Sequence, residues 1–267
     1  MAAVKSFFVP VSKTYYLCSM RILTFLYTLW ATFWFVFLFL LLFPLFWLFL
    51  QKPEWKPKAH YLNRVWAKIL FLIIGIPVKV QYDFEPDATK TYVFCANHFS
   101  YVDIPVMGLV IKNYFAFVGK ASLKSVPLFG YLFRKLHIQV DRNDKNSRTT
   151  SMSRSIKALQ SGRSVMIYPE GGIWSKEFPK MNLPLKDGGF VMAIQQQIPL
   201  VPISLLNNYE LMQDGEFGIR PRTIRVIVHK PIETTGMTND DVEALKSQFY
   251  DVVQGALDNY YTKESAV

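Results

Sequence analysis

Residues 93–105, VFCANHFSYVDIP, bring together the side chains that proton-transfer chemistry needs. An apolar, strand-like run ends at Ala96, His98 follows it, and Asp103 lies five residues beyond His98. If the next helix begins near Tyr101, the Asp103 carboxylate lies in its first turn and can reach back to the imidazole. A carboxylate on one ring nitrogen fixes the tautomer and leaves the other nitrogen as a base. Alone, the pair carries little weight, because an acid at that position also favours a helix N-terminus.

Two further segments carry groups that suit an anion. In residues 118–142 the basic side chains follow a glycine or end an apolar run, and Lys120 and Arg142 are the best candidates to hold a phosphate. Residues 167–172, IYPEGG, run from an apolar stretch into adjacent glycines, which permit a turn that presents backbone N–H groups to an anion. Each feature also has an ordinary alternative, a surface charge or a plain turn.

Alternating elements must position these residues. From Ile76 onward, apolar β-branched runs alternate with helical patterns, which predicts an α/β fold with a mixed, largely parallel sheet flanked by helices. In such a sheet the sites gather at the carboxyl ends of strands, where His98 is expected. Strands are predicted at 78–84, 91–96, 114–118, 137–141, 164–168, 200–206 and 223–230, and helices at 102–111, 127–136, 145–160, 188–197 and 238–261.

The N-terminal part predicts a membrane-embedded segment. Residues 22–50 contain no charged side chain, and as one helix they would be about 43 Å long, against a hydrocarbon core of about 30 Å. Pro44 interrupts the run and basic residues flank both ends, so a single tilted helix and a helical hairpin both remain open.

The chain therefore divides into four parts. They are a basic N-terminal segment (1–21), the membrane-embedded helix or hairpin (22–50), a linker with a second helix (51–75) and the α/β domain (76–267). Within the third part, residues 51–60 read as the linker. Residues 61–75 read as a helix that lies at the membrane interface or packs on the domain.

Composition narrows the partners. The formal net charge is +10, and the stretch from Lys112 to Arg163 contains eleven Lys and Arg residues against two acids. This favours a phosphate-bearing substrate or an acidic membrane surface. Nucleic acid is not expected, because no helix-turn-helix, zinc or RNA-binding signature accompanies the charge. The two cysteines suggest neither a disulfide framework nor a zinc site, and Cys95 reads as a packing residue. We expect no metal or other cofactor.

Taken in order, these motifs resemble those of the glycerolipid acyltransferase family, typified by lysophosphatidic acid acyltransferase (1-acylglycerol-3-phosphate O-acyltransferase, PlsC type). NHFSYVD matches the family's N-H-x-x-x-x-D signature, YPEGG resembles its F-P-E-G motif, and LKDGGF resembles its K-x-G-x-F turn. The matching residues, within about 60–210, are Asn97, His98, Asp103, Lys120, Gly130, Arg142, Pro169, Glu170, Gly171, Lys186, Gly188, Phe190 and Pro202.

The resemblance implies an O-acyltransferase. His98 would deprotonate the free hydroxyl of a lysolipid, 1-acylglycerol-3-phosphate above all, and Asp103 would orient the imidazole. The oxygen would then attack the thioester of acyl-CoA or acyl carrier protein directly, with Ser100 a weak rival nucleophile. The substrate-binding residues would be Asn97, Lys120, Arg142, Glu170, Gly171 and Gly172. The catalytic domain is expected at the cell membrane, on its cytoplasmic side, in contact with membrane lipids.

One departure from the family pattern leaves the acceptor open. The usual third motif carries an Arg three residues after its Glu, whereas this chain has Ile173 there. Lys176 could supply the missing cation, or Ile173 and Trp174 could shape a more apolar site. The alternatives to phosphatidic acid synthesis are therefore acylation of another lysolipid, such as an amino-acid lipid or a lysophospholipid. Less favoured alternatives are a lipid hydrolase and a non-catalytic lipid-binding protein.

Overall fold

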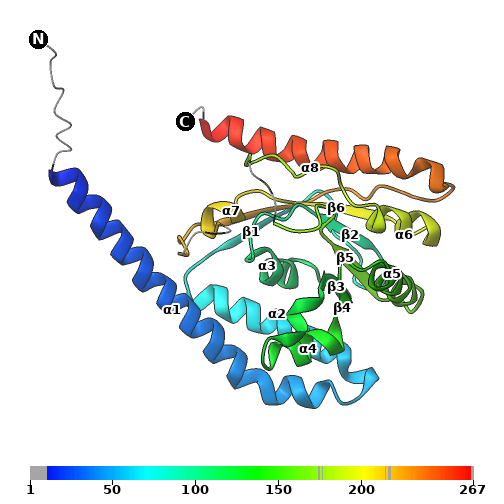
Figure 1. Ribbon diagram of the computed structural model, residues 1–267, viewed down its shortest axis with the longest axis horizontal. Coiled ribbons are helices and arrows are strands. Elements are labelled where there is room, and N and C mark those ends of the chain that lie inside the picture. Colours follow the sequence, from blue (N-terminus) through cyan, green and yellow to red (C-terminus); the bar gives the residue numbers. More distant parts are fainter. Residues whose placement is uncertain (1–10, 174, 176, 214, 216–217, 266–267) are drawn as a thin grey trace, which may run out of the picture.

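The computed structural model describes residues 11–173, 175, 177–213, 215 and 218–265, and their side chains from Arg21 to Lys263. These residues form a seven-stranded sheet in the order β1-β7-β6-β2-β5-β3-β4 (Figure 1). Neighbouring strands run parallel, except that β6 and β7 pair antiparallel. The mixed, largely parallel sheet predicted from the sequence is confirmed. The strands are β1 (Val78–Tyr82), β2 (Val93–Ala96), β3 (Phe115–Lys120), β4 (Ile138–Val140), β5 (Ser164–Ile167), β6 (Leu200–Leu205) and β7 (Ile224–Val228).

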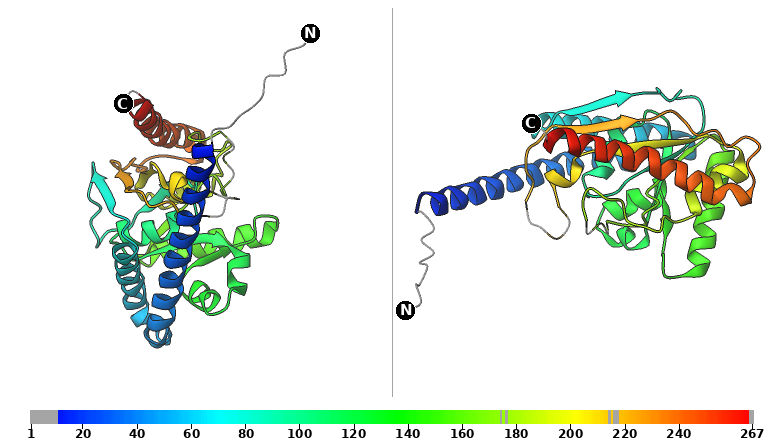
Figure 2. Two further views of the ribbon diagram at one scale, coloured as in Figure 1. Left: turned by 90° about the vertical axis from the view of Figure 1, so that its left-hand side faces the viewer. Right: turned by 90° about the horizontal axis from the view of Figure 1, so that it is seen from above.

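Helices cover both faces of the sheet (Figures 1 and 2). Because side chains alternate along a strand, β2 sends Phe94 and Ala96 into the core beneath α2 and α3, and Val93 and Cys95 into the core beneath α5, α6 and α8. Burial on both faces explains why the strands are continuously apolar in sequence. The helices of the domain are α3 (Asp103–Val110), α4 (Phe129–Leu136), α5 (Lys145–Gln160), α6 (Gly188–Gln196), α7 (Asn208–Leu211) and α8 (Val242–Ser265).

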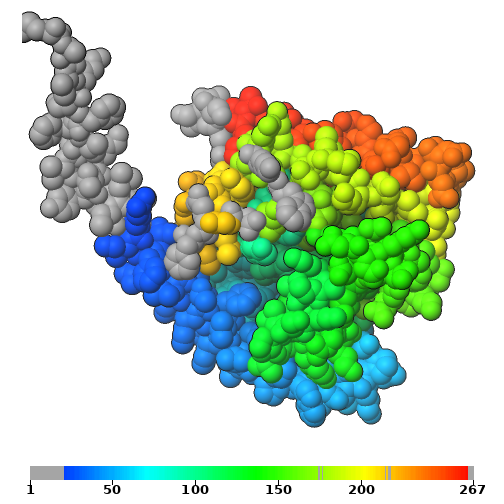
Figure 3. Space-filling view, viewed as in Figure 1, coloured from blue at the N-terminus to red at the C-terminus, as the bar shows by residue number. Residues whose placement is uncertain are grey.

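The apolar segment 22–50 belongs to one helix, α1 (Val11–Phe49), which continues through Pro44. A helix of this length and composition, from Arg21 to Phe49, can cross a membrane. Most of its apolar side chains are exposed, Leu23 by 62% and Leu41 by 60%, which distinguishes α1 from the core helix of a soluble protein. The blue part of α1 lies at the margin of the molecule in Figure 3. The chain is therefore associated with a membrane through α1.

A hairpin does form, but not inside residues 22–50. α1 packs against α2 (Lys56–Ile73), and the short turn Pro53–Trp55 joins them. The linker predicted at 51–60 was wrong in its second half, because α2 begins at Lys56. Pro57 is tolerated there, since a missing N–H in the first turn removes no helical hydrogen bond.

The second helix packs on the domain, as one of the two interpretations of residues 61–75 predicted, and its position at the membrane interface stays a prediction. Trp66 and Leu70 on α2 are buried in the core that contains α3. Arg64 Nη2 donates a 2.7 Å hydrogen bond to the carbonyl of Ile111, just beyond α3. The other side of α2 is open, since Leu72 is 78% exposed.

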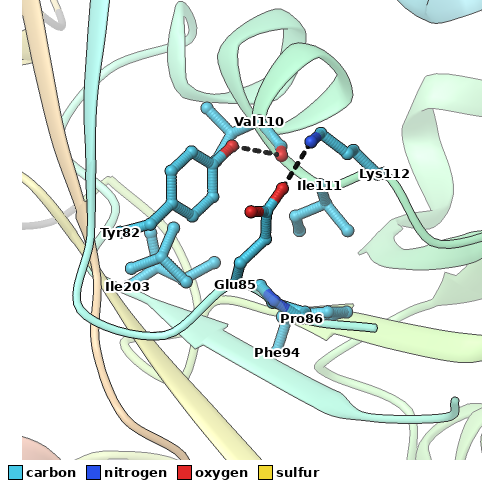
Figure 4. Close-up of a pocket in the computed structure, with 9 residues that line it drawn as sticks. Tyr82, Glu85, Pro86, Phe94, Val110, Ile111, Lys112 and Ile203 are labelled. Carbon is cyan, nitrogen blue, oxygen red and sulfur yellow. Dashed lines mark hydrogen bonds and ion pairs between the residues drawn. The ribbon is translucent and has the colours of Figure 1, made fainter. Parts of the chain in front are cut away.

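A small cavity lies between β1 and the end of α3 (Figure 4). Tyr82 Oη donates to the carbonyl of Val110 at 3.1 Å, and Lys112 Nζ lies 2.6 Å from Glu85 Oε1. The cavity offers only about 10 Å³, room for one water at most. Its polar groups already pair with each other, so it fastens β1 to α3 and leaves no room for a substrate.

Candidate active site

Asn97 secures the end of β2 to β6. Its Nδ2 donates to the carbonyl of Leu205 at 2.9 Å, and its Oδ1 accepts from the N–H of Leu205 at 2.8 Å. The side chain is fully buried. Both of its polar groups therefore serve the backbone, and the substrate-binding role predicted for Asn97 gives way to one of positioning: it fixes where His98 leaves the sheet.

His98 and Asp103 meet as the spacing predicted. His98 Nδ1 lies 2.8 Å from Asp103 Oδ2, and Asp103 is the first residue of α3. An ionised carboxylate only accepts, so Nδ1 carries the proton and the lone pair lies on Nε2. No hydrogen bond to Nε2 comes from any part of the chain that the structure describes. The imidazole is 12% exposed while Asp103 is fully buried, so the outer nitrogen faces the open side of the pair.

The Asp103 carboxylate is held from several directions. Oδ2 also accepts from the backbone N–H groups of Phe99 and Ser100, each at 3.0 Å. Oδ1 accepts from Asn208 Nδ2 at 2.7 Å. Hydrogen bonds from this many donors hold the buried carboxylate in one orientation.

Asn208 was not among the site residues predicted from the sequence. It follows β6 directly, in the pair Asn207–Asn208, and it is buried. The rule that selected His98, polar residues immediately after an apolar strand, applies equally to Asn208. The neighbouring order of β6 and β2 then brings it to Asp103, 105 residues away in sequence.

Glu170 is a second buried carboxyl group at this edge of the sheet. It follows β5, and its Oε1 accepts from the N–H of His98 at 2.6 Å, while Oε2 accepts from the N–H of Asn182 at 2.8 Å. Burial raises the pKa of Glu170 to about 8; the two backbone donors lower it and the nearby charge of Asp103 raises it. Glu170 thus joins three segments and fixes the backbone of the presumptive base.

Tyr168 forms the floor beneath His98. The two rings stack with centroids 4.0 Å apart and an interplanar angle of 15°. Burial raises the pKa of Tyr168 well above its usual value, and the charge of Asp103 adds to this. Its hydroxyl is buried and has no hydrogen-bond partner among the described residues. The stack limits rotation of the imidazole, so His98 is fixed by both its ring face and its Nδ1.

The remaining substrate-binding candidates lie along the same edge. β2, β5, β3 and β4 are successive neighbours in the sheet. His98, Glu170 and Arg142 lie two or three residues beyond the ends of β2, β5 and β4, and Lys120 is the last residue of β3. With strands about 4.8 Å apart, the cations stand roughly 10–15 Å from His98 across the sheet. Lys120 is exposed and Arg142 is half-buried, and no described residue pairs with either side chain. Both lie at the same end of the sheet as the His–Asp pair, and their binding of an anion stays a prediction.

The glycines after Glu170 shape the turn. Gly171 has a φ of +80°, a backbone conformation that favours glycine. Its N–H already donates to the carbonyl of Tyr168 at 3.0 Å. Gly172 is buried beside it. Of the two glycine N–H groups, that of Gly172 has no hydrogen-bond partner among the described residues.

The two alternative nucleophiles, the Ser100 hydroxyl and the Cys95 thiol, are both buried. Ser100 is fully buried, and its Oγ donates to the carbonyl of Met212 at 2.7 Å. Cys95 is fully buried, and burial raises the pKa of its thiol, so it stays a thiol.

Ile173 is half-buried in the turn after Gly172. The cation and aromatic ring expected nearby, Lys176 and Trp174, lie outside the described residues.

Residues 78–206 match the Acyltransferase family model. They include His98, Asp103 and Glu170. Residues 78–206 are an acyltransferase domain. The resemblance stated from the motifs is thus confirmed, and Asn208 lies just beyond the matched range.

Among curated proteins, the chain is 28% identical over 198 residues to a 1-acyl-sn-glycerol-3-phosphate acyltransferase of Saccharomyces cerevisiae, which covers 72% of this chain and 64% of the yeast protein. It is 27% identical over 175 residues to a chloroplastic 1-acyl-sn-glycerol-3-phosphate acyltransferase of Brassica napus, which covers 65% of this chain and 50% of that protein. The chain thus spans between half and two thirds of these relatives.

The fold has a solved counterpart. The crystal structure of the 1-acyl-sn-glycerophosphate (LPA) acyltransferase PlsC from Thermotoga maritima superposes with a TM-score of 0.73, covering 90% of this chain and 97% of that one, at 20% identity. The likeness extends past the acyltransferase domain to most of the chain, so the helices and strands outside residues 78–206 belong to the same fold.

Proposed function

We propose that the protein transfers a fatty acyl group from acyl-CoA or acyl carrier protein to the free hydroxyl of a lysolipid, in the first instance 1-acylglycerol-3-phosphate. The observation that carries the proposal is the His98–Asp103 pair. Its inner nitrogen is bound to a buried carboxylate, and no described residue binds its outer nitrogen. An imidazole held this way is a general base, a role worth about 10²–10⁴-fold in rate.

The reaction needs one proton and one acyl group to move. Nε2 of His98 takes the proton of the acceptor hydroxyl as its oxygen bonds to the thioester carbon. The C–S bond then breaks, and the imidazolium returns the proton to the departing sulfur. Asp103 stabilises the imidazolium without taking its proton. Since the Ser100 hydroxyl and the Cys95 thiol are both buried, direct transfer is favoured over an acyl-enzyme.

The acceptor is proposed from charge and from the relatives' names. Lys120 and Arg142 lie at the same sheet edge as His98 and carry no ion pair within the described chain. The yeast and plant relatives are named for 1-acyl-sn-glycerol-3-phosphate. Both support a phosphomonoester head group. A lipid acceptor also gives the exposed apolar surface of α1 a purpose, since the acceptor resides in the bilayer.

A different lysolipid acceptor remains the second candidate, because Ile173 stands where the family motif usually carries Arg. A competition assay between lysophosphatidic acid and a zwitterionic lysolipid decides between them. Preference for lysophosphatidic acid, lost in Arg142→Ala, supports the first proposal. Preference for the zwitterionic acceptor, unchanged by Arg142→Ala, overturns it. Ile173→Arg should improve phosphate acceptors if the cation is truly missing.

The test of the activity itself uses the full chain in detergent. Labelled acyl-CoA and acyl carrier protein are each offered with a panel of lysolipids, and products are identified by mass. We expect a diacyl product, formed about a hundredfold or more slowly by His98→Ala. Free fatty acid formed without an acceptor would instead identify a hydrolase.

We also propose that the domain lies on the cytoplasmic side of the membrane. The basic surface of the domain would there face anionic lipid, each residue near the surface contributing about 1 kcal/mol. Labelling a cysteine placed near Asp144 with an impermeant reagent tests this. Protection in intact cells is expected, and labelling from outside would contradict it.

A further inference from the structure

A basic groove lies on the face of the sheet opposite α2 and α3. Its volume is about 350 Å³, within the range of small-molecule sites. β1 and β7 form its floor at the sheet edge, and the last turns of α8 form one wall. The lining residues are Lys79, Val80, Gln81, Leu206, Arg225, Val226, Ile227, Asn259, Tyr260 and Lys263.

The charged residues that line the groove are all basic. Lys79, Arg225 and Lys263 are exposed, and among the described side chains no carboxylate lines the groove and no group forms an ion pair or hydrogen bond with these three. Two acids close in sequence to lining residues have other partners: Asp83 accepts from Gln81, and Asp258 accepts from Gln254. Three unpaired cations around a hollow favour a ligand with several negative charges.

The groove and the active site both lie at the end of the sheet where β6 finishes. Leu206 in the groove donates its N–H to the carbonyl of Arg225, and two residues later Asn208 holds Asp103. Three strand steps separate β2, which carries His98, from β1 in the groove floor. At about 4.8 Å a step, the groove lies roughly 15 Å from the base across the sheet. A ligand in the groove could therefore extend an arm over the β6–α7 connection to His98.

We propose that this groove binds the nucleotide end of the acyl donor, the adenosine 3′-phosphate and diphosphate of coenzyme A. The inference rests on the proposed acyl transfer and selects acyl-CoA as donor. The three cations meet the phosphates, while the half-buried Tyr260 and Ile227 offer an apolar surface for the base. The thioester then lies at the far end of a flexible arm, at the distance of His98. α1 packs on the other side of the sheet, so the groove suits a donor arriving from water.

A comparison of two acyl donors distinguishes the contribution of the groove from that of the rest of the site. Acyl-CoA and acyl-phosphopantetheine carry the same thioester arm, but the second lacks the nucleotide. We expect the full-length enzyme to show a KM at least tenfold lower for acyl-CoA, with the same kcat. In Lys79→Gln/Arg225→Gln/Lys263→Gln the advantage of acyl-CoA should disappear. The KM for lysophosphatidic acid and the rate with acyl-phosphopantetheine should not change.

A matched control removes the same charge elsewhere. Lys90→Gln/Arg154→Gln/Lys157→Gln changes three exposed cations outside the groove and should keep the wild-type preference. Equal KM values for both donors in the wild type, or an unchanged preference in the groove variant, overturn the inference. So does strict use of acyl carrier protein.

Direct binding keeps the test independent of the reaction. Titration calorimetry with adenosine 3′,5′-bisphosphate should show binding to the wild type and to the control variant, and none to the groove variant. This result stands even for a protein that transfers no acyl group, which would overturn the proposed function alone. Absence of binding to the wild type would overturn the groove assignment while leaving acyl transfer intact.

Discussion

The described residues include two His–Asp pairs in different regions, and their differences define the candidate site. His98 Nδ1 lies 2.8 Å from the fully buried Asp103. At the end of β7, His229 Nδ1 lies 3.5 Å from Asp83, whose side chain is 37% exposed. The two imidazoles are nearly equally exposed, by 12% and 13%. Exposure of the ring therefore does not distinguish a base from a structural histidine.

The outer ring nitrogen does distinguish them. His229 Nε2 lies 2.8 Å from Ser204 Oγ, so both of its nitrogens are engaged, and Ser204 is fully buried beneath α8. Ser204, His229 and Asp83 resemble a hydrolytic triad by residue type, yet the serine offers no access to a substrate. Burial lowers the pKa of His229, while Asp83 raises it. The arrangement ties β6, β7 and β1 together. His98 differs because its carboxylate is rigid and its second nitrogen is open.

Removing each histidine should give the largest contrast. His98→Ala should lower kcat by roughly 10²–10⁴-fold, because the general base is lost. His229→Ala should retain most of the activity and instead lower stability. Steady-state rates in detergent and melting curves of both variants measure this. Comparable losses of kcat in two well-folded variants would end the distinction between the pairs.

Changing each carboxylate should give the next largest contrast. Asp103→Asn should lower kcat by about a hundredfold or more, since its amide can donate to Nδ1 and hold the wrong tautomer. Asp83→Asn is the matched change at the second pair and should leave kcat within about twofold. A fully active, folded Asp103→Asn enzyme would contradict the assigned orientation of His98.

Asn208 should matter less than the acid it holds. Asn208→Ala removes one hydrogen bond to a charged, buried oxygen, which is worth about 1.5–3 kcal/mol, or roughly tenfold to a hundredfold. We expect kcat to fall by that amount and the pH profile of kcat to change, because the carboxylate that orients the His98 imidazole is held less firmly. Lower stability with an unmoved pH profile would reduce Asn208 to a packing residue.

Glu170 should produce a pH effect on stability. Its pKa is raised to about 8 when folded, so the folded state binds the proton more tightly than the unfolded state. Stability should therefore fall as pH rises from about 4.5 to 8 and then level off. In Glu170→Gln that slope should flatten, as measured by thermal melts across this range. An equally steep slope in the variant would assign the effect to another group.

The smallest change concerns the ring beneath His98. Tyr168→Phe keeps the stack and removes a buried hydroxyl that has no described partner. An unpaired buried hydroxyl costs about 1–3 kcal/mol, so the variant should melt at a higher temperature. A lower melting temperature would show that the hydroxyl is bonded, by water for example.

Local rules account for much of what the sequence predicted. β2 and β5 were found because they are short apolar runs that end in polar residues, and five residues suffice for α3 to return Asp103 to His98. The same rule marks Asn208 as a polar residue after an apolar strand, but it gives neither the contact of Asn208 with Asp103 nor the partner of Asn97. Both depend on β6 lying beside β2, a pairing over more than 100 residues that no local pattern encodes.

The errors at the N-terminal part have a similar origin. Pro44 was read as a possible break, yet a proline removes only one helical hydrogen bond and the apolar helix continues beyond it. The start of α2 at Lys56 was missed because its first turn contains the prolines and charges of a linker. What commits that turn to a helix is packing of Ala59 and Leu62 against α1 and α4, which is long-range information.

The strand order also sets the sequence of events during synthesis. β1 directly follows α2, but within the described chain its ladder partner is β7, which leaves the ribosome 146 residues later. Until residue 228 has been made, α1 and α2 are complete while the N-terminal edge of the sheet has no neighbour. An unpaired edge strand invites association with other chains. The synthesis of β7 thus determines when a chain already committed to the membrane becomes safe from aggregation.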